Sequence, residues 1–549
     1  MITVRKIFAS FSTKERKLFW LAFVIACIAL IGLVFFFIIY KTESKPANGG
    51  KYSEGLIGQP TFINPILSNT EIDKNFVQVL FSPLKENVSQ IEPDKNFAIW
   101  RVRLLEKLMW TDEELITSED IIFTIEAIKD PATQSPLRSI WQGVSVKRLG
   151  ELEVELTTSR PEISFKDQIE SLFLIPAHIF KNVPAENWRI SDYNLQPIGN
   201  GPYKFKSLQR KNDGFMTSYE LEVNKFYNGE RSYIDSINFS LFPDYVKAVE
   251  AFEAGSIQVL AGIEPETIEF INRPFNIYAY KLPSYYAIFL NQSRSSILRD
   301  ASTRKALEFA TPRDLLVDEA LGGKAEILNT PIQSISEGQI YNPDKSRELL
   351  ESSGWTLQNN TDGNALKIFR TRFTKQGEEN LEINLAVPKI SFLTKTAEII
   401  QKAWQDVGVR VNLVLIEPDQ ILETVVKNRD YEALVFGNIL NKPNDLFPFW
   451  HSSERFYPGL NLSLYNNKRA DQLMEEVRNT PSQPEAISKL TELVKIISND
   501  IPAIFLYSPN YLVLAGKNIK GIEPGTIESP FKRLEQIKSW YMKTSRVFK

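Results

Sequence analysis

The sequence predicts a mixed α/β protein with two unlike lobes, preceded by one transmembrane helix. Three observations support this fold class. Residues 18–40 contain no charged side chain. Residues 382–436 alternate between strand and helix patterns in the order β-α-β-α-β, which is typical of an α/β unit. The first third of the chain is richer in strand patterns, so we expect its lobe to differ from the other.

The N-terminal segment has the properties of an uncleaved membrane anchor. Residues 18–40 are long enough to cross a hydrocarbon core of about 30 Å as an α-helix. Residues 1–17 carry five basic residues and one acidic residue, which keeps them in the cytoplasm and directs the remaining chain outward. Thirteen uncharged residues follow Cys27, so cleavage and lipidation at this cysteine is the less favoured alternative. Residues 41–52 are polar and are expected to form a flexible tether.

Capping residues and apolar spacing predict the elements of the exported part in order. Residues 117–120 (TSED) resemble a capping box, and apolar side chains follow at helical spacing until Pro131. Glycines end four later helices, at Gly255, Gly322, Gly354 and Gly408. The expected strands are 144–146, 152–156, 219–223, 234–241, 382–386, 409–416 and 433–436. The expected later helices are 242–254, 302–320, 344–353, 391–406 and 419–427.

Composition excludes several classes of function. The 549 residues are 43% hydrophobic and 24% charged, as expected for a folded protein of two or three domains. One Cys and two His cannot form a disulfide scaffold or a zinc site of several such ligands, and we expect no metal and no cofactor. Because residues 1–17 contribute +4 to a total charge of −3, the remaining chain carries −7. This acidic balance predicts no nucleic-acid partner.

No sequence pattern indicates catalysis. Residues 322–324 (GGK) lack the other parts of a phosphate-binding loop and are interpreted as a helix C-cap. Neither Gly-x-Ser-x-Gly nor His-Glu-x-x-His occurs. His178 is interpreted as a packed or capping residue. His451 follows Trp450 in a loop rich in Phe and Trp, where contact with a ligand is a candidate role.

Aromatic residues indicate binding rather than turnover. They make up 11% of the chain, and each alone is usually part of a core. Several fall in segments with turn patterns: Trp141, Trp188, Phe447, Phe449, Trp450, Phe456 and Tyr457. Aromatic side chains clustered in loops are typical of a cleft that holds a flexible ligand.

Several segments, in the right order, resemble one protein family. The segments are 55–65 (GLIGQPTFINP), 110–123 (WTDEELITSEDIIF), 199–203 (GNGPY), 300–314, 341–355, 429–433 (RDYEA) and 502–506 (PAIFL). Together they are similar to the extracellular solute-binding proteins of family 5, the oligopeptide-, dipeptide- and nickel-type binding subunits of ABC importers. The chain departs from the family pattern at Glu113, where a glycine is usual, and in a shortened stretch between residues 84 and 97.

The resemblance implies a bilobal, periplasmic-binding-protein-like fold with a hinged cleft and no catalysis. Lobe II is then inserted into lobe I, with crossings near residues 281–287 and 499–506. The expected boundaries are 53–283 plus 504–549 for lobe I, with an accessory subdomain at about 73–196, and 284–503 for lobe II.

The resemblance, together with the aromatic residues in turn-like segments, gives the candidate ligand-binding residues. They are Gln59, Phe62, Asn64, Trp141, Phe436, Gly437, Asn438, Leu440, Asn441, Trp450 and His451. In peptide-binding relatives an aspartate holds the α-amino group of the peptide, and Asn441 lies nearest to that position, with Asp445 as the alternative. Exposed main-chain groups at residues 436–441 are expected to bind an extended peptide as an added strand.

The expected function is that of a solute-binding subunit of an ABC importer, tethered at the outer face of the cytoplasmic membrane by residues 18–40. It captures peptides or another small solute and delivers them to the permease subunits, with a monomeric exported part. One alternative is a membrane-anchored cell-surface hydrolase whose carboxylates converge only in the fold. Another is a ligand sensor or assembly factor that uses the same cleft.

Overall fold

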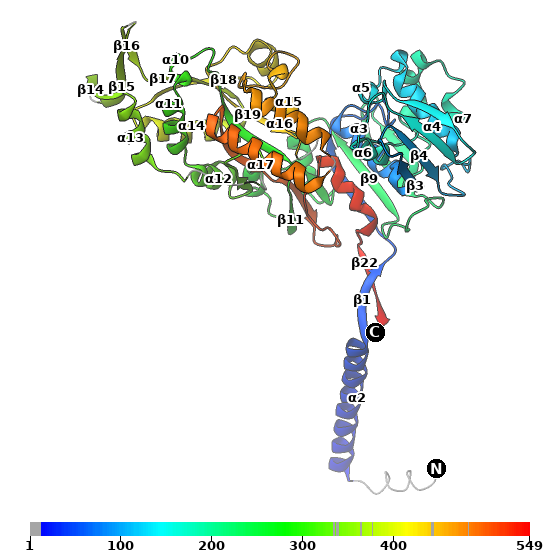
Figure 1. Ribbon diagram of the computed structural model, residues 1–549. Helices are drawn as coiled ribbons and strands as arrows, with labels where there is room; N and C mark the ends of the chain where they lie inside the picture. The colour runs from blue at the N-terminus through cyan, green and yellow to red at the C-terminus, as the bar shows by residue number, and fades with distance from the viewer. Residues whose placement is uncertain are drawn as a thin grey trace.

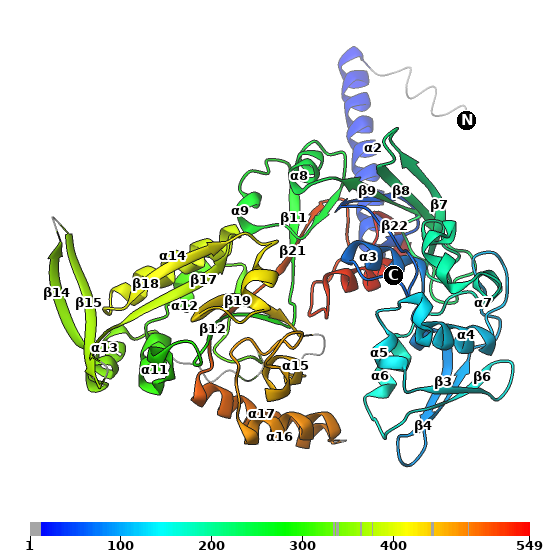
Figure 2. The ribbon, with the colours of Figure 1, turned by 90° about the horizontal axis from the view of Figure 1, so that it is seen from above.

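The computed structural model describes residues 12–549, except residues 333–334, 336–339, 363–364, 376, 441–443 and 481. Two large sheets organise the chain, and each is covered by its own helices (Figures 1 and 2). We call the part built on the seven-stranded sheet lobe I and the part built on the six-stranded sheet lobe II.

Lobe I contains strands from both halves of the chain. In spatial order its large sheet consists of β11 (Phe275–Tyr280), β21 (Tyr511–Gly516), β10 (Val259–Ala261), β2 (Lys51–Ile57), β9 (Ser236–Phe242), β8 (Met216–Val223) and β7 (Tyr203–Arg210). A second sheet consists of β3 (Val88–Pro93), β4 (Ile99–Leu104), β6 (Glu153–Thr157) and β5 (Ser145–Arg148). Its helices include α3 (Glu71–Leu80), α4 (Ser118–Lys129), α5 (Arg138–Trp141), α6 (Phe165–Ser171), α7 (Ala177–Phe180), α8 (Tyr245–Glu253), α9 (Pro265–Ile268) and the 3-10 helix η7 (Pro530–Ser539).

Lobe II has the more regular α/β arrangement. Its large sheet consists of β13 (Ala325–Ile327), β20 (Ala503–Pro509), β12 (Ser284–Leu290), β19 (Ala433–Ile439), β17 (Glu382–Pro388) and β18 (Arg410–Ile416). Its helices include α10 (Ser296–Arg299), α11 (Ala301–Phe309), α12 (Arg313–Leu321), α13 (Pro343–Ser352), α14 (Ser391–Gln405), α15 (Phe447–Trp450), α16 (Lys468–Asn479) and α17 (Gln483–Asp500). A small sheet of β14 (Thr356–Asp362), β15 (Ala365–Thr374) and β16 (Gly377–Asn380) completes it.

The central strand β12 is buried on both faces. Ile288 and Leu290 pack into one core with α11, α12 and α14, whereas Ala287 and Phe289 pack into the other with α16 and α17. Successive side chains of a strand point to opposite faces, so a strand covered on both sides must be apolar throughout. This explains the sequence IFL in β12 and fixes the sheet as the rigid centre of lobe II.

Several predicted elements are confirmed, and one is divided. The capping box exists: Asp120 accepts a hydrogen bond from Thr117 N at 2.9 Å, and α4 begins at Ser118. The single helix expected at 302–320 is instead α11 and α12, because Pro312 has no N–H for a continuous helix and stands at the start of α12.

The segment expected as a flexible tether is largely ordered. Within residues 41–52, β1 (Thr42–Ala47) pairs antiparallel with β22 (Lys543–Phe548). Before it, α2 (Thr13–Lys41) is a helix long and apolar enough to cross a membrane. The local composition of this segment indicates a coil, because the strand that orders it comes from the far end of the sequence.

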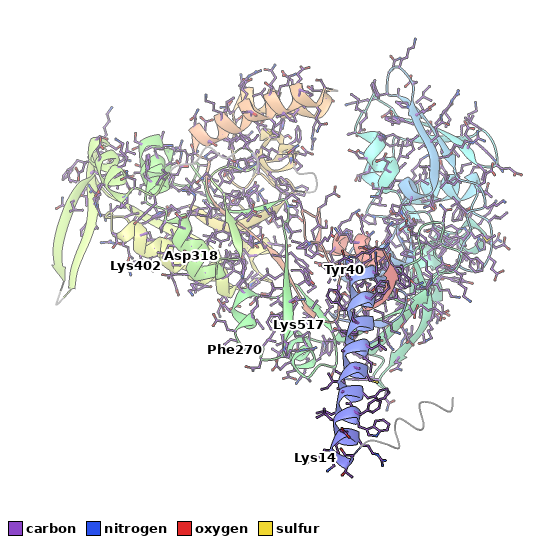
Figure 3. All side chains as sticks on the ribbon, turned by 90° about the horizontal axis from the view of Figure 1, so that it is seen from below. Lys14, Tyr40, Phe270, Asp318, Lys402 and Lys517 are labelled. Carbon is purple, nitrogen blue, oxygen red and sulfur yellow. The ribbon has the colours of Figure 1, made fainter. Side chains whose placement is uncertain are left out.

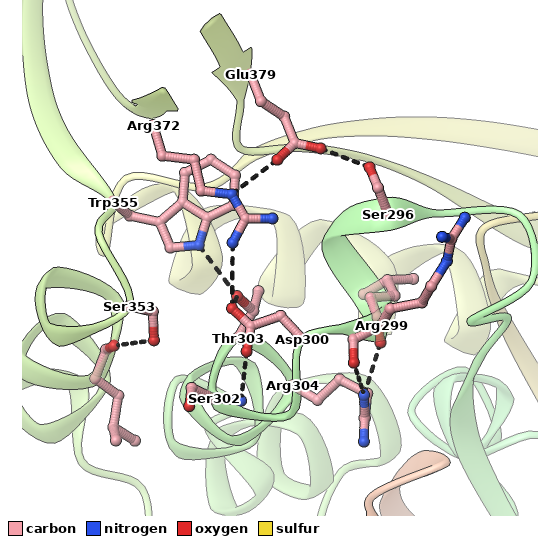
Figure 4. Close-up of polar contacts among 12 residues, drawn as sticks. Ser296, Arg299, Asp300, Ser302, Thr303, Arg304, Ser353, Trp355, Arg372 and Glu379 are labelled. Carbon is pink, nitrogen blue, oxygen red and sulfur yellow. Dashed lines mark hydrogen bonds and ion pairs between the residues drawn. The ribbon is translucent and has the colours of Figure 1, made fainter. Parts of the chain in front are cut away.

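A cation–π contact attaches the small sheet to the end of lobe II (Figure 4). The guanidinium carbon of Arg372 on β15 lies 4.2 Å from the centre of the Trp355 ring. Arg372 also forms ion pairs with Asp300 at 3.2 Å and Glu379 at 2.8 Å. Trp355 Nε1 donates to Thr303 Oγ1 of α11 at 3.1 Å. These contacts place the small sheet far from the junction between the lobes (Figure 2).

Candidate functional site

Two short extended segments join the lobes. The chain passes from β11 to β12 through residues 281–283 and returns from β20 to β21 through Asn510. The second crossing therefore lies at Asn510 rather than within the expected residues 499–506, because β20 pairs with β12 in lobe II. Beside these segments, Ser284 Oγ of β12 and Ser508 Oγ of β20 are 3.2 Å apart within lobe II. Two adjacent extended crossings are a typical hinge, since a few backbone angles can rotate one lobe against the other.

The turn after β2 is fixed by side chains of lobe I. The Gln59 amide accepts from Met216 N at 2.8 Å and donates to Met216 O at 2.9 Å. Asp73 at the start of α3 accepts from Thr61 N at 2.7 Å and from Phe62 N at 3.1 Å. These bonds satisfy the backbone of an irregular segment and hold it in one conformation.

The other predicted residues of this turn have structural partners. Phe62 is half-buried beneath Arg189, whose guanidinium carbon lies 4.9 Å from the ring centre. Asn64 is buried, and its side-chain oxygen accepts from Ile66 N at 3.1 Å. Gln59, Phe62 and Asn64 thus come together in one turn, where Phe62 presents partly exposed apolar surface and the other two define the shape.

Strand β19 of lobe II has an incomplete ladder. All seven residues of β19 pair with β12 on one side. On the other side, the ladder to β17 involves only Ala433 and Leu434 within the described residues. Residues 435–439 therefore have a strand edge without a β partner in the described part of the chain. Such an edge offers a row of backbone donors and acceptors to another extended segment.

Two tyrosines of β12 support this edge. Asn438 is buried and donates through Nδ2 to the hydroxyl of Tyr285 at 2.9 Å. The ring of Tyr286 lies across Gly437, where an added Cβ would approach within 2.6 Å. Burial raises the pKa of both tyrosines, so they remain neutral hydrogen-bonding groups.

The remaining predicted residues of β19 have different surroundings. Phe436 and Gly437 are half-buried, Leu440 is buried, and Asn441 lies outside the described residues. Ile439, which lies within the predicted segment 436–441, is 53% exposed at the end of the edge. The search for aromatics in loops also missed Tyr285 and Tyr286, because both lie in a strand; the alternation of the strand was the signal that could have found them.

Trp141 and Trp450 lie in hydrophobic cores in this structure. Trp450 has no exposed surface and stacks on Tyr285 and Phe289, with ring centres 6.4 and 6.1 Å apart. Trp141 is buried against Phe165, with ring centres 5.4 Å apart. Their placement corrects the expectation that both rings line the cleft directly: turn patterns around a tryptophan do not reveal whether its ring points inward.

An aromatic and charged stack lies between residues 445 and 478. Phe447 lies between His451, with ring centres 4.0 Å apart, and the guanidinium of Arg478, 4.1 Å from its ring centre. Asp445 accepts two hydrogen bonds from Arg478, at 2.9 and 2.7 Å. The alternative in which Asp445 holds a peptide ammonium group is therefore disfavoured, because its charge is already balanced by a bidentate partner.

The two His residues are separated in the fold. His178 Nε2 lies 2.8 Å from Asp112 in lobe I, and His451 Nδ1 lies 2.8 Å from Ser453 in lobe II. Within the described part of the chain, no group of three His, Cys, Asp or Glu side chains is arranged to hold a metal ion.

A comparison with known protein families gives a match that covers most of the chain. Residues 87–456 match the middle region of the bacterial extracellular solute-binding proteins, family 5. The oligopeptide-binding protein AppA of Bacillus subtilis is 25% identical over 530 residues, which cover 91% of this chain and 93% of AppA.

Two solved structures have the same fold. The structure of Bacillus subtilis AppA in complex with a nonapeptide has a TM-score of 0.65 and 24% identity, and the match covers 91% of this chain and all of AppA. The structure of NikZ from Campylobacter jejuni in complex with Ni(L-His) has a TM-score of 0.67 and 22% identity, covering 89% of this chain and 99% of NikZ. The two lobes therefore form a periplasmic-binding-protein fold.

Proposed function

Since this chain belongs to the bacterial extracellular solute-binding proteins of family 5, we propose that it captures peptides between its two lobes and delivers them to the permease of an ABC importer. Membership in this family makes it a binding protein without catalysis. The observation that carries the peptide assignment is the incomplete ladder of β19.

The edge at residues 435–439 suits an extended peptide. A peptide strand added there would bond to the backbone of β19 whatever its side chains, which gives affinity without strict sequence preference. Ile439 and Phe436 provide apolar contacts beside this edge. The turn containing Phe62 in lobe I is the proposed opposite wall, and a peptide bridging both walls would favour the closed state by its additional contacts.

A metal complex is the less supported ligand. The names of relatives include both an oligopeptide-binding protein and nickel-binding proteins. Nickel held by the protein itself favours imidazole ligands, and this chain has two His, of which His178 pairs with Asp112. We therefore propose that the ligand is a peptide. The second part of the proposal concerns the membrane anchor.

The proposed anchor is α2. Its 18–40 core is uncharged, and the basic residues before it place the N-terminus inside. A tether of this kind keeps the receptor near its permease and raises their effective concentration. The proposed localisation is the cytoplasmic membrane, with both lobes outside.

Ligand extraction from the full chain tests the peptide assignment. The protein is purified from membranes in mild detergent, denatured, and the released small molecules are identified by mass spectrometry. A mixture of short peptides is expected. Recovery of a sugar, a lipid or a nickel chelate in place of peptides would overturn the assignment.

Backbone-modified peptides test the binding mode. A recovered peptide is compared with versions in which single amides are N-methylated, using calorimetric titration. N-methylation at alternate positions should weaken binding by about tenfold, because each lost strand hydrogen bond leaves a buried carbonyl unpaired. Equal weakening at every position, or none, would contradict strand addition at β19.

The intact mass of the membrane-bound protein tests the anchor separately. We expect the full N-terminal sequence in the fraction that resists extraction with alkaline carbonate. A protein that begins with a lipidated Cys27, or a released form without α2, would contradict an uncleaved anchor while leaving the peptide assignment intact.

A further inference from the structure

The strand pair between α2 and the two lobes brings the far ends of the sequence together. β1 pairs with β22 from Thr42↔Phe548 to Ala47↔Lys543. Lys549 N also donates to the carbonyl of Lys41, the last residue of α2, at 2.9 Å. Figure 1 shows both strands in line with α2, between this helix and the lobes. We call residues 41–47 and 543–549 the basal ribbon.

The basal ribbon is basic, whereas the lobes are acidic. Its charged residues are Lys41, Glu43, Lys45, Lys543, Arg546 and Lys549. The ribbon thus contributes +4 to the −7 carried beyond residue 17, which leaves −11 on residues 48–542. Glu43 is paired with Lys45 at 2.9 Å, so the net charge of +4 comes from Lys41, Lys543, Arg546 and Lys549, of which Arg546 also donates to Thr42 Oγ1 at 2.8 Å.

The cations of the ribbon lie at different heights above the end of α2. Lys41 and Lys549 are level with its last turn, and their ammonium groups lie 5.8 and 5.7 Å from the ring centre of Tyr40. Arg546 pairs with Ser44, two residue pairs along the ribbon from Thr42↔Phe548, and so lies about 7 Å farther from the end of α2. Lys543 stands five pairs beyond, at a rise of about 17 Å, which exceeds the screening length of about 8 Å in physiological salt.

Two exposed aromatic side chains mark the same level. Tyr40 is 63% exposed and Phe548 is 76% exposed. Figure 3 shows Lys14 and Tyr40 at opposite ends of α2, and Figure 1 shows that the end of α2 that carries Tyr40 is the one facing the basal ribbon. Aromatic rings are typical of the boundary between hydrocarbon and headgroups, so cations beside Tyr40 stand where phosphate groups would lie.

We propose that the basal ribbon binds the phosphate groups of anionic phospholipids in the outer leaflet, through Lys41, Arg546 and Lys549. This inference rests on the proposed anchoring by α2. The bound headgroups would keep the ribbon upright on the membrane, while the acidic lobes are repelled by the same surface and held away from it. Each basic side chain near an anionic surface strengthens such a contact by about fivefold.

Amide hydrogen exchange in lipid nanodiscs tests the proposal. The full chain is inserted into discs of phosphatidylcholine with and without phosphatidylglycerol, and exchange is followed at residues 41–47 and 543–549. We expect exchange at least about fivefold slower in discs with phosphatidylglycerol, and loss of this difference in high salt.

A charge-matched pair of variants identifies the residues responsible. The test variant combines Lys41→Gln, Arg546→Gln and Lys549→Gln. The control combines Lys85→Gln, Lys95→Gln and Lys375→Gln, which are exposed lysines of the lobes. The test variant should lose the lipid-dependent protection, and the control should keep it. Equal ribbon exchange of both variants in phosphatidylcholine discs shows that the strands remain paired.

The outcomes separate this inference from the anchor. Protection that is equal in both lipids, or that persists in the test variant, overturns the role of the ribbon although the chain stays in the discs. A chain that fails to co-elute with the discs overturns both the anchor and the ribbon.

Discussion

The hydroxyl of Ser391 lies 3.0 and 2.9 Å from the two carboxylate oxygens of Glu266 and so joins lobe II to lobe I. Ser391 begins α14 and Glu266 is in α9. In Figure 2, α9 and α14 lie to the left of β11 and β21, whereas α5 lies to the lower right of these strands and α15 lies below them. A rotation that brings α5 and α15 together would therefore separate Ser391 from Glu266.

Removing this contact should favour closure. We expect Ser391→Ala to raise peptide affinity by about twofold to fivefold, because an exposed hydrogen bond that stabilises the present arrangement contributes about 0.5–1 kcal/mol. Calorimetric titration measures the change, with Ser352→Ala as the control within lobe II. Unchanged or weaker binding would show that the contact survives closure.

Gly437 has almost no space for a side chain, because the ring of Tyr286 lies across it. An added Cβ would lie 2.6 Å from the Tyr286 ring, so Gly437→Ala must displace this ring or the strand edge. We expect a loss of about 1–3 kcal/mol in unfolding free energy and weaker peptide binding. Urea denaturation and titration measure both. Gly150→Ala, where no atom lies within 4 Å, is the control, and equal effects of the two changes would refute the prediction.

A buried ion pair holds η7 against the sheet of lobe I. Arg533 pairs with Glu54 and donates to Asn75 Oδ1 at 2.9 Å, and both charged side chains are almost inaccessible. Burial opposes the charge of Arg533, but the carboxylate of Glu54 outweighs this effect and raises its pKa.

Breaking this pair should be costly. Glu54→Gln leaves a buried guanidinium without its countercharge, and we expect a loss of about 3–5 kcal/mol in unfolding free energy. The exposed Glu43→Gln should change it by less than about 0.5 kcal/mol. Chemical denaturation followed by tryptophan fluorescence compares the two variants. Similar midpoints would show that the buried pair of Glu54 and Arg533 does not stabilise lobe I more than an exposed pair does.

Glu86 should make the stability of lobe I sensitive to acid. Burial opposes its charge, but donors outweigh this effect and lower its pKa below the usual 4.5: Tyr227 at 2.8 Å, Lys538 at 3.3 Å and Ser82 at 3.0 Å. A lowered pKa gives stability that is present above 4.5 and lost as the pH falls through the folded-state value. Glu86→Gln should therefore be less stable near neutral pH and lose less below 4.5. Parallel pH profiles from thermal unfolding would contradict this prediction.

Local patterns identified much of the fold. The capping box at Thr117 and the C-cap at Gly322 depend on neighbours within a few residues, so the sequence predicted both. The division at Pro312 was missed because apolar spacing continues across it. In the candidate site, the family resemblance was sufficient to predict the segment at residues 436–440. It did not predict Tyr285, which supports this segment from another strand.

The sequence by itself determined the apolar helix, most strands and helices, and the family resemblance, because each depends on residues close together in the chain. Only the tertiary structure decided which residues meet across long separations. It placed Arg478 on Asp445, left residues 435–439 of β19 with an incomplete ladder, and paired Lys41 with Lys549. Strand pairing and charge balance depend on the partner that the fold supplies, so local composition cannot reveal whether an edge is covered or a charge is already neutralised.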